Sequence, residues 1–107
     1  MTRLERSVQV VNRKGLHARA SAKLAGLAGG LPARITLSFE GETADARSIM
    51  DLLCLGAGIG ATVSVQAEGE QAETALQAVE ELFATGFGEL GEDKARSDTE
   101  PPPSTAD

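Results

Sequence analysis

Two periodicities alternate along the sequence, and this alternation restricts the fold more than any other feature. Apolar residues recur at every second position in residues 6–12, 33–41 and 61–69, the pattern of strands with one buried face. Residues 42–46 follow a turn at Glu40-Gly41, and we expect them to form a short return strand. Helical spacing or good helix formers mark the three segments 17–30, 48–56 and 71–86.

The resulting order is β-α-β-β-α-β-α. A strand with alternating residues belongs to a sheet that keeps one face in water, so the helices must cover the other face. We therefore predict an α+β fold with two layers, in which helices pack on a four-stranded, mainly antiparallel sheet.

The last part of the sequence has a different composition. From Gly91 onward it reads "GEDKARSDTEPPPSTAD", with five acids, two bases and almost no apolar residues. This composition is typical of disorder, because it offers too little apolar surface to offset the entropy of ordering. We predict a folded domain over residues 1–90 and a disordered, acidic, Pro-rich tail over residues 91–107.

Charge and composition exclude several classes of function. The net charge of −6 and the three aromatic residues, all Phe, argue against nucleic acid and an anionic membrane surface as partners. We find no signal segment and no apolar run long enough to span a bilayer, and the single cysteine cannot form an internal disulfide. A cytoplasmic protein is expected, with Cys54 as a small buried apolar residue.

His17 is the one histidine of the chain and lies where the first helix should begin. A neutral imidazole is a nucleophile near physiological pH, and the start of a helix attracts anions. His17 is therefore a candidate phosphoryl acceptor, with Arg19 placed to bind phosphate oxygens and Gly15 allowing close approach.

The alternative is an exposed capping histidine among ordinary surface charges. The chain has no second histidine and no metal-ligand spacing around this one, so we expect neither a metal nor a cofactor. A single nucleophile suits a carrier better than a hydrolase, which needs further groups.

Ser48 precedes the second helix and has Asp51 three residues later, as expected for a helix N-cap. Ile49, Met50 and Leu53 cannot all face inward on so short a helix, which predicts an apolar surface for a partner. The alternative buries Ile49 and Leu53 and leaves Met50 alone exposed.

The segments "GLHARASAK" and "ARSIMDLLCLGAGIGATVSVQAEGEQAETALQAVEELF" resemble the HPr-type phosphocarriers of the bacterial phosphotransferase system. The resemblance implies an open-faced β-sandwich, with three helices on one face of a four-stranded antiparallel sheet. It implies that His17 becomes a pros-phosphohistidine, charged by Enzyme I from phosphoenolpyruvate and discharged to an Enzyme IIA-type domain. Arg19 would assist, and partners would dock on Ala20, Ile49, Met50 and Leu53. We expect a monomer.

Two positions refine this resemblance. Sugar-transport members of the family usually have proline where this chain has Ala20, so the sequence is closer to the nitrogen-related branch, whose output is regulatory. The serine that matches Ser48 is the target of an HPr kinase/phosphorylase where a host has one. A cap role and a regulatory role are compatible, because a phosphate is favourable at a helix start.

Two other functions stay open. One is a regulatory module on the same fold that binds partners without transferring phosphate and is controlled at Ser48, although such a module would have no need of His17. The other is a small-molecule-binding domain of ferredoxin-like shape, for which the sequence has no evident pocket signal.

Overall fold

The computed structural model describes residues 3–91, and its order of elements confirms the predicted β-α-β-β-α-β-α sequence. The predicted tail, apart from Gly91, lies outside the described residues. The elements are β1 (Arg3–Gln9), α1 (Ala18–Gly29), β2 (Arg34–Phe39), β3 (Glu42–Asp45), α2 (Ile49–Leu55), β4 (Thr62–Glu68), α3 (Ala72–Ala84) and the 3-10 turn η1 (Gly86–Gly88).

The four strands form one sheet in the order β1-β4-β2-β3, and every neighbouring pair is antiparallel. The register places Val8 opposite Val63 and Leu37 opposite Val65, so apolar side chains line up on the same face. These pairs explain why the alternating pattern predicted the strands: a shift by one residue would turn every apolar side chain toward water.

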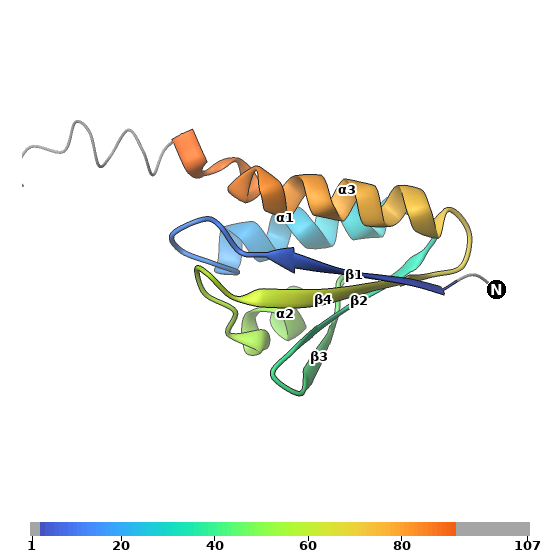
Figure 1. The fold of residues 1–107 in the computed structure, drawn as a ribbon, viewed down its shortest axis with the longest axis horizontal. Coiled ribbons are helices and arrows are strands. Elements are labelled where there is room, and N and C mark those ends of the chain that lie inside the picture. The colour runs from blue at the N-terminus through green and yellow to red at the C-terminus, as the bar shows by residue number, and fades with distance from the viewer. Residues whose placement is uncertain (1–2, 92–107) are drawn as a thin grey trace, which may run out of the picture.

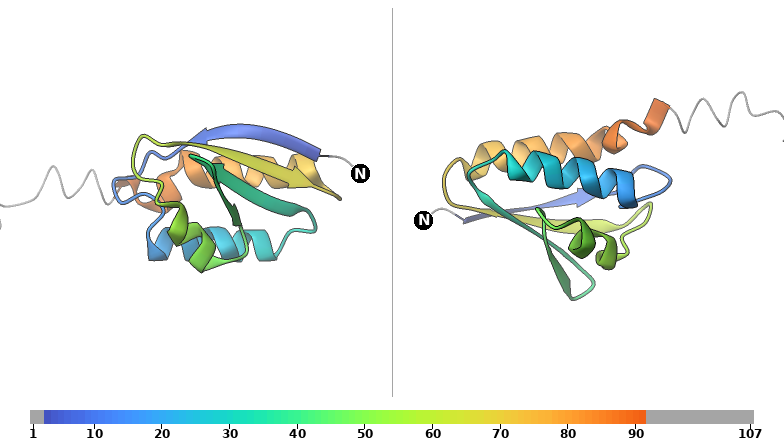
Figure 2. Two further views of the ribbon diagram at one scale, coloured as in Figure 1. Left: turned by 90° about the horizontal axis from the view of Figure 1, so that it is seen from below. Right: turned by 180° about the vertical axis from the view of Figure 1, so that it is seen from behind.

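The three helices cover this apolar face, and the opposite face stays open (Figure 1). Helices α1 and α3 lie side by side along the sheet, and α2 lies beside β3 and the start of α1 (Figure 2). Leu24, Leu52, Leu76 and Phe83 come from the three helices and are fully buried against the sheet. The expected open-faced β-sandwich is confirmed.

Both predicted helix starts are confirmed. His17 is the N-cap residue of α1, and Ser48 is the N-cap residue of α2, where its hydroxyl accepts the N–H of Asp51 at 3.1 Å. The carboxylate of Asp51 does not complete a capping box, because it accepts the N–H of Asp45 at 3.3 Å. Helix α2 ends at Gly56 in a left-handed conformation, which glycine adopts without strain.

Two predictions about single residues are wrong. Ala20 is fully buried and cannot belong to a partner surface, since it lies on the side of α1 that Leu24 and Ala28 also turn toward the core. Cys54 is exposed, because the short helix α2 turns only Leu52 and Leu55 inward.

Candidate functional site

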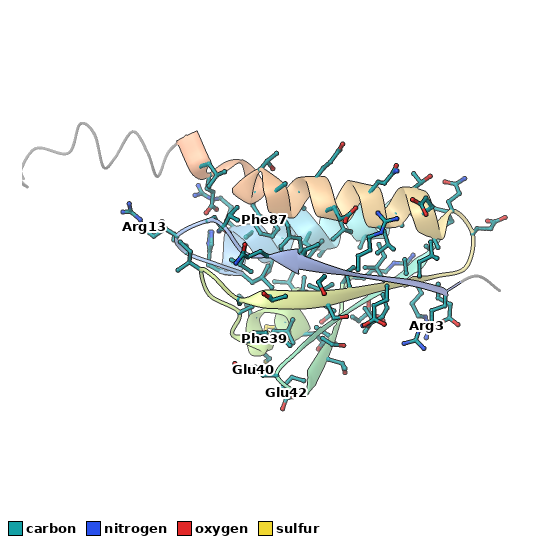
Figure 3. The ribbon with its side chains drawn as sticks, viewed as in Figure 1. Arg3, Arg13, Phe39, Glu40, Glu42 and Phe87 are labelled. Atoms are coloured by element: carbon teal, nitrogen blue, oxygen red, sulfur yellow. The ribbon has the colours of Figure 1, made fainter. Side chains whose placement is uncertain are left out.

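Three segments that are distant in the sequence meet at one end of the molecule (Figures 1 and 2). They are the β1–α1 loop, the α2–β4 loop and the turn after α3. Figure 3 shows Arg13 and Phe87 at this end, whereas Arg3 lies at the opposite end. The N–H of Leu16 donates to the carbonyl of Ala57 at 3.0 Å, so the first two loops are joined directly.

Gly15 is required where these two loops touch. Its φ of +63° is a conformation that residues with a side chain rarely adopt. A Cβ atom at this position would lie 2.5 Å from the carbonyl oxygen of Ala57 and 2.8 Å from the Cα of Gly58. The close approach expected at Gly15 is therefore made by the backbone of the α2–β4 loop.

His17 contacts a carboxylate that was not predicted from the sequence. Its Nε2 atom lies 2.6 Å from Oε2 of Glu89, which follows η1. The His17 side chain is 24% exposed, whereas that of Glu89 is only 2% exposed. The imidazole makes no capping hydrogen bond to α1, so the alternative of an exposed capping histidine is wrong.

Two further side chains contact the Glu89 carboxylate. The amide Nδ2 of Asn12, a fully buried residue, donates to Oε1 of Glu89 at 3.1 Å and to the carbonyl of Gly15 at 2.9 Å. Arg19 approaches from α1, with its Nε 3.4 Å from Oε2 of Glu89. Asn12 thus connects the buried acid to the loop that carries His17.

These contacts keep Glu89 ionised. Burial works to raise the pKa of Glu89, but the hydrogen bonds from Asn12 and His17, with the charges of His17 and Arg19, outweigh burial and bring the pKa below its ordinary value. A carboxylate can only accept hydrogen bonds, so Nε2 of His17 must carry the proton that they share. In the neutral ring Nδ1 then has the free lone pair.

The surroundings of His17 combine a nucleophile with groups that can bind an anion. The first N–H groups of a helix have no partners within the helix and carry a partial positive charge. His17 precedes these groups of α1 without capping them, and Arg19 adds a guanidinium in the first turn. A nucleophilic nitrogen and donors for an anion are therefore found together.

The second predicted surface lies on α2. Ile49, Met50 and Leu53 are 41%, 67% and 37% exposed, so the alternative that buries Ile49 and Leu53 is wrong. Ser48 begins this helix, and the guanidinium of its neighbour Arg47 donates to the carbonyl of Leu31 at 3.0 Å, just beyond the end of α1. No helix within residues 3–91 has both the length and the apolar character needed to cross a membrane.

Asn12 and Glu89 were not among the site residues predicted from the sequence. The only local signal for Glu89 was an acid set among glycine and apolar residues, "GFGEL", directly after an amphipathic helix. Its role depends on a contact with His17 across 72 positions of the chain, which no local pattern describes.

Comparisons with known proteins give a consistent result. The family described as "PTS HPr component phosphorylation site" matches residues 4–85. The Phosphocarrier protein HPr of Cupriavidus necator is 44% identical over 86 residues, which cover 80% of this chain and 97% of that protein. The Phosphocarrier protein NPr of Shewanella violacea is 43% identical over 89 residues, which cover 83% and 98%.

A solved structure has the same fold. The crystal structure of the phosphocarrier protein HPr from Bacillus anthracis superimposes with a TM-score of 0.74 at 32% sequence identity. The match covers 78% of this chain and 99% of the Bacillus anthracis chain.

Proposed function

The chain belongs to the HPr family of phosphocarrier proteins, and from this premise we propose that Nδ1 of His17 accepts the phosphoryl group. The observation that carries this proposal is the 2.6 Å contact between Nε2 of His17 and the buried carboxylate of Glu89. Because that contact assigns the proton to Nε2, Nδ1 keeps the lone pair that a nucleophile needs.

The proposed transfer forms one bond and breaks another. The Nδ1 lone pair attacks phosphorus, and the bond between phosphorus and the donor group of Enzyme I breaks, with its electron pair staying on the donor. The imidazole ring takes a positive charge, and its Nε2–H points to the carboxylate of Glu89. The negative charge of Glu89 therefore stabilises the phosphorylated ring relative to the free one.

We propose that two groups bind the phosphoryl oxygens. The N–H groups at the start of α1 are one, since the first turn of a helix forms a ready anion site. Arg19 is the other, because its guanidinium lies on that turn and approaches Glu89 without being buried. Its planar donors match phosphate oxygens.

The proposed partners are Enzyme I, which supplies the phosphoryl group, and an Enzyme IIA-type domain, which accepts it. Ile49, Met50 and Leu53 are the proposed apolar contact surface, because adjacent exposed apolar side chains gain free energy when a partner covers them. All site residues come from one chain, so a monomer suffices for this function.

We further propose a regulatory output in a nitrogen-related system. The similar relatives include both HPr and NPr at almost equal identity, so identity alone does not separate the branches. The support comes from Ala20, which fills the third position of α1 where sugar-transport relatives usually have proline.

Ser48 supports a second, compatible role as a phosphorylation site for an HPr kinase/phosphorylase. Its side chain is only partly buried, and its hydroxyl already lies at the start of α2. A phosphate there would approach Arg47 but also the carboxylates of Asp45 and Asp51.

The experiment that tests the transfer combines the protein with Enzyme I and labelled phosphoenolpyruvate. We expect label that is stable in base and lost in acid, as for phosphohistidine. His17→Ala should lose this label and remain folded, because the His17 ring does not cap α1. Labelling of His17→Ala at the wild-type rate would exclude His17 as the acceptor.

A further inference from the structure

The backbone that carries Glu89 has an unusual conformation. Gly86, Phe87 and Gly88 have φ values of +62°, +57° and +78°, so three successive residues lie in the left-handed region. Glycine enters this region freely, but a residue with a side chain such as Phe87 does so rarely and needs support from its surroundings. Such a turn keeps its shape only if other parts of the fold hold it.

Two contacts hold the turn at Phe87. Its ring is fully buried and meets Phe83 edge to face, with 4.9 Å between the ring centroids. Its carbonyl accepts a hydrogen bond from Nζ of Lys23 at 2.6 Å. A Cβ atom on Gly88 would lie 3.3 Å from the same ammonium nitrogen, so Lys23 lies directly against the turn.

Lys23 belongs to the same helix as Arg19, one of the residues that contact Glu89. It lies four residues after Arg19, and residues with this spacing share one face of a helix. From that face Arg19 approaches the carboxylate of Glu89, and Lys23 binds the backbone two residues before it. The first half of α1 therefore contacts both the side chain of Glu89 and the turn that positions Glu89.

We propose that Lys23 is a positioning residue for phosphoryl transfer, because it fixes the left-handed turn that holds Glu89 against Nε2 of His17. This inference rests on the proposed function of His17. Lys23 acts through Glu89 and touches neither the imidazole nor the phosphoryl group. Lys23 is thus part of the site although its only contact with the site is through the turn that carries Glu89.

The other explanation for a lysine near an anion site is long-range attraction of an acidic partner. Lys14 offers a matched control, because it is exposed, lies in the β1–α1 loop and carries the same charge. Lys23→Met and Lys14→Met remove one charge each, but only Lys23→Met removes the hydrogen bond to Phe87.

The first test measures transfer from Enzyme I in Lys23→Met, Lys14→Met, Glu89→Gln and the double variant Lys23→Met/Glu89→Gln. We expect Lys23→Met to lower the maximal transfer rate by up to the factor of about five that is expected for Glu89→Gln, because Lys23 acts only through the position of Glu89. The double variant should be no slower than Glu89→Gln alone. Losses that multiply in the double variant would overturn the proposal.

The second test needs no phosphoryl transfer. The Glu89 carboxyl can be titrated by carbon NMR in the full chain, where we expect a pKa below the ordinary value in the wild-type protein and in Lys14→Met. In Lys23→Met the pKa should rise toward the ordinary value, because the carboxylate no longer stays against Asn12 and His17. An unchanged titration in Lys23→Met would overturn the role of Lys23, whereas a wild-type protein that Enzyme I does not label would overturn the proposed function alone.

Discussion

Glu89 binds His17 at 2.6 Å on Nε2, the nitrogen opposite the proposed acceptor Nδ1. The carboxylate is buried and further held by Asn12, so it fixes both the orientation and the tautomer of the ring. The same arrangement assigns different tasks to the two ring nitrogens: one is held by the protein, and the other remains for the phosphoryl group.

Glu89→Gln should slow phosphoryl transfer without abolishing it. A glutamine still accepts the N–H of His17, but the hydrogen bond loses its charge, a change of about 1 kcal/mol or a factor of about five in rate. Stopped-flow transfer from Enzyme I measures this effect. Glu81→Gln is the matched control, because Glu81 is an exposed acid of α3 and its variant should transfer at the wild-type rate.

Truncation just after Glu89 and truncation just before it should have different effects on phosphoryl transfer. Removal of the residues after Leu90 should leave the melting temperature and the transfer rate nearly unchanged, because that segment has little apolar content. Removal of the residues after Gly88 deletes Glu89 and should slow transfer at least as much as Glu89→Gln. Equal rates for the two truncated proteins would contradict a role for the carboxylate.

Acid should weaken the fold through Glu89. Because its pKa in the folded protein lies below the ordinary value of about 4.5, the ionised carboxylate stabilises the fold fully above that value. This contribution is lost as the pH falls from about 4.5 through the lowered pKa of the folded state, where Asn12, His17 and Arg19 lose their charged partner.

Melting temperatures of the wild-type protein and Glu89→Gln, measured from pH 7 down to pH 3, test this dependence. The wild-type protein should melt at the higher temperature at pH 7, and the difference should shrink below about pH 4.5. A difference that stays constant across this range would show that the pKa of Glu89 is not lowered in the folded protein.

Gly15→Ala should destabilise the domain by about 2 kcal/mol or more, since the new Cβ would be strained at positive φ and would collide with the backbone of Ala57 and Gly58. Gly26→Ala is the opposite case, because Gly26 lies within α1 with no atom near its missing Cβ. That substitution should stabilise the domain by about 0.5–1 kcal/mol. Denaturant unfolding of both variants measures the contrast.

Ser48→Asp should reduce transfer from Enzyme I, whereas Ser48→Ala should transfer normally. The added charge lies beside Ile49 and Met50, where an apolar contact must lose water, and each 1.4 kcal/mol lost costs about tenfold in affinity. Circular dichroism should show both variants folded. If authentic phospho-Ser48 also accepts phosphate at the unmodified rate, Ser48 is a helix cap and the regulatory role fails.

The fold could be predicted because its elements have local causes. The alternating apolar residues of β4 and the helical spacing of α3 each report which face is buried, and the serine before α2 reports where that helix begins. The errors came from a very short helix and from a small residue. Cys54 of α2 was predicted to be buried but is exposed. Ala20 was predicted to lie on a partner surface but is buried, as its small size and its helical spacing from Leu24 favour.

The site could be predicted only where its residues are neighbours in sequence. His17 and Arg19 lie within one helix turn, so their charge and position are visible together. Asn12 and Glu89 become part of the site through tertiary contacts alone, and a buried ionised acid runs against the usual exposure of glutamate. Lys23 acts through a backbone carbonyl, which has no signature in the sequence at all.

The separation of His17 and Glu89 also has a consequence for the order in which the protein is made. A ribosome synthesises the nucleophile early and the carboxylate 72 residues later, after every strand and helix of the domain has been produced. A growing chain therefore presents an imidazole on which no carboxylate yet holds the proton at Nε2. The contact that assigns the proton to Nε2 can form only after Glu89 has been added, so the proposed acceptor site is completed late in synthesis.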